Sequence, residues 1–75
     1  MITAKVRIST VLMNDSVILG ELRKIDGVKN AYLNIGMREI FVEIQGNDKK
    51  TLDDILFLRI RKVKGVRSTS PLILN

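Results

Sequence analysis

Hydrophobic and polar residues alternate along three stretches of the chain, as they do in strands that bury one face of a sheet. These stretches cover residues 2–9, 28–35 and 39–45. A fourth stretch, residues 66–74, is rich in β-forming residues but contains Pro71, which favours a strand at the edge of a sheet. Because the second and third stretches lie only three residues apart around Gly36, we expect them to form a β-hairpin.

Apolar residues recur at helical spacing in two segments between these strands. The first helix should follow the capping residues 14–16 and end at Gly27. Its buried face should consist of Ile18, Leu22 and Ile25.

The second helix should begin after residues 47–48, either of which can cap it, and end at Gly65. Its apolar stripe consists of Leu52, Ile55, Leu56, Ile60 and Val63. Arg59 falls inside this stripe, so we expect its long side chain to carry the charge out to the edge of the core. Phe57 and Leu58 fall outside the stripe, which indicates a second contact surface on this helix.

An internal repeat organises these elements. The segment LRKIDGVK at residues 22–29 recurs as IRKVKGVR at residues 60–67. Each copy spans the end of a helix, a glycine and the start of a strand, so the chain consists of two β-α-β halves. We therefore predict an α+β fold of the ferredoxin-like βαββαβ type, a four-stranded antiparallel sheet with two helices on one face.

The predicted sheet has one face toward the helices and one open face. The face toward the helices should carry Ala4, Val6, Ile8, Ala31, Leu33, Ile35, Ile40, Val42 and Ile44. The open face should carry Lys5, Arg7, Asn30, Tyr32, Asn34, Glu39, Phe41 and Glu43. It is either a solvated surface with cross-strand ion pairs or a dimer interface. In a dimer, Tyr32 and Phe41 would form the buried centre, with Lys5, Arg7 and Glu43 around them.

Composition limits what the protein can do. A domain of 75 residues has a thin core and usually needs a disulfide, a metal or a partner subunit. The chain contains no Cys and no His, which excludes disulfides, zinc sites of the usual type and His-dependent catalytic triads. Asp53 and Asp54 are adjacent, as on a solvated helix face. We therefore expect a homo-oligomer that is not an enzyme and has no cofactor and no metal.

The chain shows no basic-and-apolar leader and no long apolar run. We therefore expect a cytoplasmic protein with no membrane partner. Its Lys- and Ile-rich composition is typical of a thermophile.

Several short segments together resemble a known family. They are ITA at residues 2–4, LRKI and GVK within 22–29, AY at 31–32 with Gly36, and IRKVKGVRST at 60–69. On these segments the chain resembles the RAM (regulation of amino-acid metabolism) domain, the effector-binding domain of Lrp/AsnC transcriptional regulators. It is most similar to versions of the domain that stand alone. The resemblance implies that residues 1–75 form one ligand-binding domain without a DNA-binding domain.

The resemblance also implies how such a domain works. Its members dimerise through their sheets into an α+β barrel, often form octamers, and bind an amino acid or a similar small metabolite between subunits. The candidate ligand-binding residues are Gly36, Met37, Arg38, Glu39, Thr69 and Ser70. A glycine turn exposes backbone N–H groups to a carboxylate, and Arg38 can add a bidentate bond. Full-length Lrp/AsnC regulators are potential partners in mixed oligomers.

The main alternative is a basic nucleic-acid-binding protein of the same fold. The net charge of +5 and the pI of about 10.0 favour it. The third strand, however, carries Phe41 between Glu39 and Glu43, and these carboxylates repel phosphate. Direct nucleic-acid binding is therefore disfavoured. A phosphate-handling enzyme is disfavoured as well, because residues 10–13, TVLM, stand where a glycine-rich loop would follow the first strand.

Overall fold

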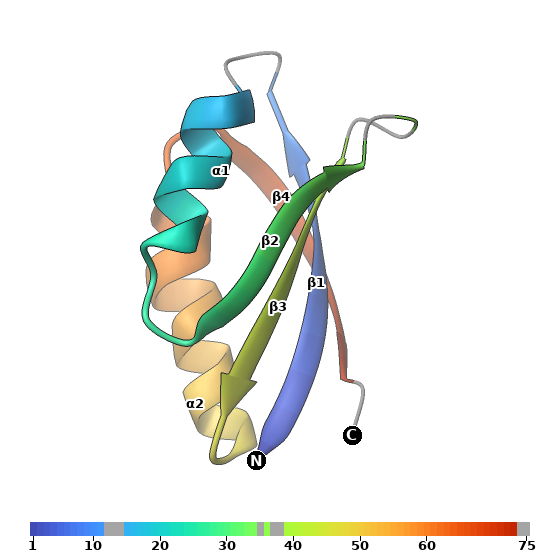
Figure 1. Ribbon diagram of the computed structural model, residues 1–75. Helices are drawn as coiled ribbons and strands as arrows, with labels where there is room; N and C mark the ends of the chain where they lie inside the picture. The colour runs from blue at the N-terminus through green and yellow to red at the C-terminus, as the bar shows by residue number, and fades with distance from the viewer. Residues whose placement is uncertain (12–14, 35, 37–38, 74–75) are drawn as a thin grey trace.

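The computed structural model describes residues 1–11, 15–34, 36 and 39–73 (Figure 1). The main elements follow the predicted order: β1 (Ile2–Thr10), α1 (Asp15–Arg23), β2 (Val28–Asn34), β3 (Glu39–Gly46), α2 (Lys49–Asp54) and β4 (Val66–Ile73). Helix α2 continues into a π-helical segment, η1 (Ile55–Arg59), and then into a 3₁₀ turn, η2 (Ile60–Lys62). Among these residues, no helix is both long enough and apolar enough to span a membrane.

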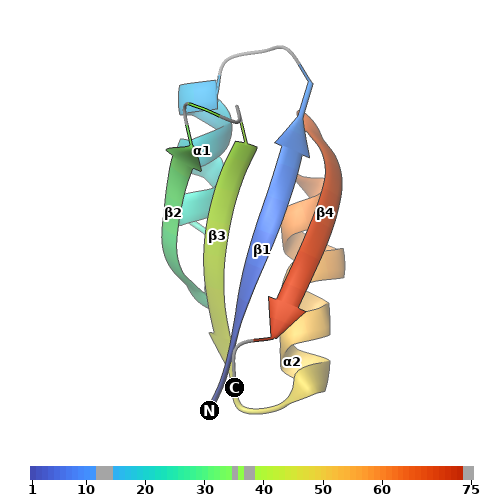
Figure 2. The same cartoon turned by 90° about the vertical axis from the view of Figure 1, so that its right-hand side faces the viewer.

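The four strands form one antiparallel sheet in the order β2-β3-β1-β4. The first strands of the two halves, β1 and β3, therefore lie side by side at its centre. Both helices cover the same face, and Figure 2 shows the sheet from the uncovered side. Strand β4, which contains Pro71, lies at one edge as its sequence predicts. The structure thus confirms the ferredoxin-like α+β fold.

The core lies between the sheet and the helices and consists of side chains that the alternation and the helical stripes predicted. Its buried members are Ala4, Val6, Ile8, Ile18, Leu22, Ala31, Ile40, Val42, Ile44, Leu52, Ile55, Leu56 and Ile60. At its centre Val6 of β1 pairs with Val42 of β3, and both side chains are fully buried. Leu33 on the edge strand β2 is only half-buried, and Ile35 lies outside the described residues.

The repeated segment forms the same turn twice. In both copies, N–H groups near the end of the helix and at the start of the next strand donate to carbonyls three residues earlier. These bonds run from Ile25 to Leu22 (3.2 Å), Val63 to Ile60 (3.1 Å), Val28 to Ile25 (3.2 Å) and Val66 to Val63 (3.1 Å). Gly27 and Gly65 then adopt φ angles of 96° and 101°, which favour glycine. Ile25 and Val63 therefore lie in these turns, beyond the helices in which the periodicity placed them.

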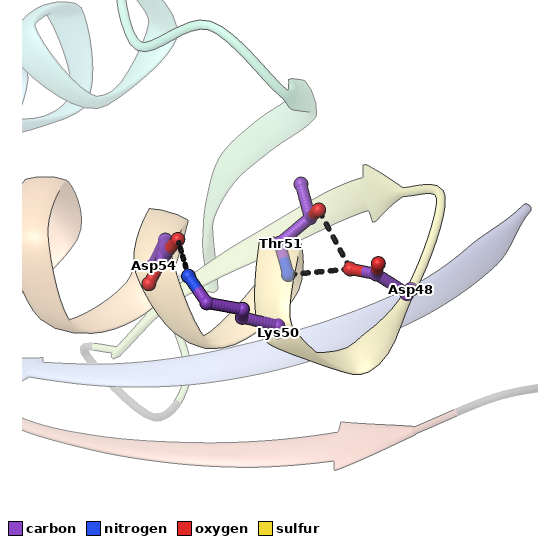
Figure 3. Close-up of polar contacts among 4 residues, drawn as sticks. All are labelled: Asp48, Lys50, Thr51 and Asp54. Carbon is purple, nitrogen blue, oxygen red and sulfur yellow. Dashed lines mark hydrogen bonds and ion pairs between the residues drawn. The ribbon is translucent and has the colours of Figure 1, made fainter.

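Asp48 caps the N-terminus of α2. Its Oδ1 accepts a hydrogen bond from the Thr51 hydroxyl at 2.7 Å and one from the Thr51 backbone N–H at 2.8 Å (Figure 3). These two donors, the hydroxyl first, hold the pKa of Asp48 below its ordinary value. The cap that the sequence predicted at residues 47–48 is thus confirmed and assigned to Asp48.

The second helix departs from the predicted stripe where it becomes π-helical. The Ile60 N–H donates to the carbonyls of both Ile55 and Leu56, which widens this turn relative to an α-helix. A helix of constant period would place Arg59 inside the apolar stripe, but in the structure Arg59 is exposed. This exposure agrees with the expectation that Arg59 carries its charge out of the core, and the wider turn changes which side chains face the core. The two residues before it, predicted outside the stripe, are exposed as expected.

Gly27→Ala should destabilise the protein, and Gly20→Ala is its matched control. A Cβ at Gly27 would lie 2.5 Å from Ile55 Cδ1, in a backbone conformation with φ of +96°. A Cβ at Gly20, inside α1, would meet nothing within 4 Å. In urea unfolding, Gly27→Ala should lower the free energy of unfolding by about 1–2 kcal/mol, and Gly20→Ala should raise it by about 0.5–1 kcal/mol. Equal effects would contradict the turn geometry.

The Asp48 cap should make the stability of the fold depend on pH in the acidic range. Because folding lowers the pKa of Asp48, its contribution is complete above the ordinary value of 3.8 and disappears as the pH falls through the folded-state value. Asp48→Asn keeps a capping side chain that does not titrate. Thermal unfolding between about pH 6 and about pH 2 should show a smaller loss of stability in Asp48→Asn than in the parent protein. Parallel curves for the two proteins would count against the cap.

Candidate functional site

The open face of the sheet brings together the five side chains predicted for a dimer interface. Direct cross-strand partners lie on the same face of a sheet. The strand registers pair Lys5 with Glu43, Arg7 with Phe41, and Tyr32 with Phe41. These five side chains therefore form one continuous surface on the side that Figure 2 turns toward the viewer. We call this surface the open-face cluster.

The rings of Tyr32 and Phe41 form the apolar centre of the open-face cluster. Their centroids lie 5.7 Å apart and their planes differ by 29°, which is a stacked arrangement. Lys5 Nζ lies 5.3 Å from the Phe41 centroid and 5.7 Å from the Tyr32 centroid, so the ammonium group sits over both rings. A hydrogen bond with Tyr32 and, next in size, electrostatic interaction with the same residue raise the pKa of Lys5, and Glu43 adds to the effect. Lys5 therefore remains a cation throughout the neutral range.

Arg7 and Glu39 form a charged pair beside the rings. Arg7 Nε lies 3.5 Å from Glu39 Oε2, diagonally between β1 and β3. The Glu39 side chain is only 21% exposed. Its Oε1 atom is buried and accepts no hydrogen bond from the part of the chain that the structure describes. An unsatisfied buried oxygen is costly, so a donor supplied by a second molecule would be favourable here.

A shallow hollow of about 300 Å³ adjoins the open-face cluster over β1, between side chains of β3 and β4. Its walls are formed by Lys5, Arg7, Phe41, Ser70, Pro71 and Leu72. Leu72 pairs with Lys5 and is 64% exposed, so it adds an apolar side chain to the open face. The sequence did not identify Leu72, because its face depends on the register of β4 against β1. Once Ser70 is placed opposite Arg7, alternation alone assigns Leu72 to the same face.

Four of the predicted ligand-binding residues belong to the hairpin between β2 and β3. Gly36 lies in the turn and is exposed. Glu39 begins β3, opposite Asn34 of β2. Met37 and Arg38 lie outside the described residues. The described part of the predicted site therefore places Gly36 and Glu39 near the same end of the sheet.

The other two predicted ligand-binding residues, Thr69 and Ser70, lie on opposite faces of β4. Thr69 pairs with Ile8, whose side chain is in the core, so Thr69 faces the helices. Ser70 pairs with Arg7 and faces the open side. Strand β1 separates β4 from β3, and Glu39 lies two residues along β3 from Phe41, the partner of Arg7, so Ser70 and Glu39 lie roughly 12 Å apart. One chain alone therefore does not bring all the predicted residues together.

The acidic residues of α2 form separate ion pairs. Lys50 Nζ lies 3.1 Å from Asp54 Oδ2 (Figure 3), and Lys49 Nζ lies 3.4 Å from Asp53 Oδ2. All four side chains are largely solvated, as the sequence predicted for this helix face. Within the described ranges, no three acidic side chains gather closely enough to hold a metal ion.

No protein-family model matches the chain, and no curated protein matches it. Solved structures do match. The chain is similar to FFRP-DM1, with 27% sequence identity, 100% of both chains covered and a TM-score of 0.89.

Two longer solved proteins share the fold. One is the transcriptional regulator NMB0573 from Neisseria meningitidis, solved as a complex with L-Met, with 14% identity and a TM-score of 0.83. The match covers 99% of this chain and 49% of NMB0573. The other is AsnC from E. coli, with 24% identity and a TM-score of 0.74. The match covers 95% of this chain and 50% of AsnC. The chain thus spans about half the length of each, and its fold occurs in a transcriptional regulator and in AsnC.

Proposed function

We propose that the chain is a regulatory, effector-binding RAM domain of the Lrp/AsnC type, spanning residues 1–75 and acting without catalysis. Two copies associate through their open faces into an α+β barrel, and larger assemblies such as octamers are built from these dimers. A free amino acid or a similar small metabolite binds between subunits. The observation that carries the proposal is the fold that this chain shares, over 99% of its length, with a transcriptional regulator in complex with L-Met.

The charges of the open face support association by two-fold symmetry. In such a contact the same surface of each copy meets its counterpart, so the stacked rings of one open-face cluster would lie against those of the other. Two cations, Lys5 and Arg7, and two carboxylates, Glu39 and Glu43, surround the rings. A partner turned by 180° can bring opposite charges together. Aromatic residues at the centre with charges at the rim are typical of stable interfaces.

The hairpin between β2 and β3 supports an amino-acid site at the border between subunits. The proposed ligand-binding residues are Gly36, Met37, Arg38, Glu39, Thr69 and Ser70. Backbone N–H groups around Gly36, together with the Arg38 guanidinium, suit an α-carboxylate. The unsatisfied Oε1 of Glu39 suits the α-ammonium group of the same ligand. Because β1 separates Thr69 and Ser70 from the hairpin in one chain, we assign them to the site from a neighbouring subunit.

A module of this kind can regulate transcription without touching DNA. In a mixed oligomer with a full-length Lrp/AsnC regulator, the partner supplies the DNA-binding part. Effector binding at the shared interface then changes the partner's affinity for DNA through the coupling between subunits.

Direct nucleic-acid binding through the open face is the weaker alternative. Tyr32 and Phe41 offer two rings on which bases could stack. Glu39 and Glu43 place negative charge beside these rings, and that charge repels the phosphate backbone. The open face therefore suits a second copy of the chain better than a nucleic acid.

Phe41→Glu should abolish association, and Phe57→Glu is the matched control. Phe57 is 48% exposed on the helix layer, so the same substitution there leaves the open face intact. Phe41→Glu buries a carboxylate at the centre of the proposed interface, which should weaken dimers by about thirtyfold or more. Light scattering coupled to gel filtration should show monomers for Phe41→Glu, whereas Phe57→Glu should still form the open-face dimer. A monomeric parent protein at about 100 μM would refute the dimer.

An amino-acid effector should stabilise the folded oligomer. A ligand at about 100 times its Kd adds about 2.7 kcal/mol, which raises the Tm of a domain this small by about 10–20 °C. A thermal-shift screen of the twenty amino acids, L-Met included, should reveal at least one such ligand. Arg38→Ala should remove the shift and leave the oligomer unchanged. If no amino acid raises the Tm of a confirmed oligomer, the effector must be of another class and this part of the proposal fails.

A further inference from the structure

A groove lies on the helix layer, between α1 and the second half of the long helix formed by α2, η1 and η2. Its volume is about 670 Å³. Aliphatic side chains from both helices line it: Val17, Ile18, Ile25, Leu58 and Val63. Ile18 is buried, but Val17 and Leu58 are 58% and 61% exposed. The apolar lining therefore extends the core outward into water.

The rim of this groove is positively charged. Lys24, Arg59, Lys62 and Lys64 surround the aliphatic lining, and Glu21 is the one carboxylate among the described residues that line it. Glu21 is already paired with Lys24 at 3.0 Å. Arg59, Lys62 and Lys64 form no ion pair with any acidic residue in the described ranges. Three cations without an ion-pair partner among the described residues thus lie beside an exposed apolar groove.

The π-helical turn supplies both kinds of side chain to the groove. Leu58 and Arg59 belong to η1, where the Ile60 N–H is shared between two carbonyls. On a regular helix, Arg59 would point toward the core. Such turns are rare and occur often at functional sites, so the irregular backbone at the groove is a second observation that favours a binding role.

We propose that this groove is a docking site for an acidic amphipathic helix of another protein. A helix laid between two others buries its own apolar stripe against their side chains, which is an established mode of peptide recognition. Glu and Asp residues that flank such a stripe would meet Arg59, Lys62 and Lys64 at the rim. The opposite charges would also speed the encounter of the two proteins.

The chemistry of the groove disfavours other occupants. A second copy of this chain would bring the same cations together, which is repulsive. The described residues that line the groove include no aromatic side chain on which the bases of a nucleic acid could stack. A flat bilayer would not reach Ile18 at the bottom of the groove. Docking here is independent of the function proposed above, because residues of the helix layer line the groove, whereas the open-face cluster lies on the face of the sheet that the helices leave uncovered.

Calorimetric titration with a synthetic peptide tests the proposal. The peptide has about 18 residues, with Leu at i, i+3, i+4 and i+7 along one stripe and Glu on both flanks. The full chain should bind it with an affinity that falls as salt is added. Leu58→Glu should weaken binding by about tenfold or more, and so should Val17→Glu, which keeps the test valid if one variant folds poorly. The double variant Lys62→Gln/Lys64→Gln should weaken binding by about tenfold.

The matched control is the double variant Lys49→Gln/Lys50→Gln. It removes the same charge from the far end of the same helix and should change the affinity by less than about twofold. An equal loss in this control would mean non-specific attraction and would overturn the proposal. Failure to bind at about 1 mM peptide would also overturn it, as would equal binding of a peptide with Lys in place of Glu. Binding of single-stranded DNA or phosphatidylglycerol vesicles that Leu58→Glu abolishes, without peptide binding, would assign the groove to another partner.

Discussion

The pairing of β1 with β3 is the constraint on which the rest of the structure depends. These strands begin the two halves of the chain and lie at the centre of the sheet, with Val6 opposite Val42. Because side chains alternate along a strand, this one register directs the apolar residues toward the helices and Lys5 and Phe41 toward the open face. A slip of one residue in this register would turn the apolar side chains to the open face and the polar ones to the helices, so that neither the core nor the open-face cluster could form.

Much of this arrangement could be predicted because it depends on local patterns. Strict alternation in residues 2–9 and 39–45 identified the two central strands and the side chains on each of their faces. The repeat at residues 22–29 and 60–67 located both glycine turns and showed that the chain consists of two similar halves. These patterns predicted the members of the open-face cluster, because a residue belongs to it when its side chain lies on the open face of one of the adjacent strands.

Features that depend on long-range geometry could not be predicted. Leu72 joins the open face only through the register of β4 against β1, which no local pattern specifies. The exposure of Arg59 depends on a π-helical turn, in which the Ile60 N–H reaches the carbonyl five residues earlier as well as the usual one. The charged groove on the helix layer was not predicted either, because it too depends on long-range geometry.

Pro71 on β4 bears on whether further strands can add to this edge of the sheet. Amyloid-like fibrils grow by adding strands to an open sheet edge, and each addition needs an unbroken row of backbone donors and acceptors. The nitrogen of Pro71 carries no hydrogen, so this row is interrupted within an edge strand. Strand addition along this edge is therefore impeded, so the proposed two-fold contact between open faces would give a closed assembly and not a growing fibril.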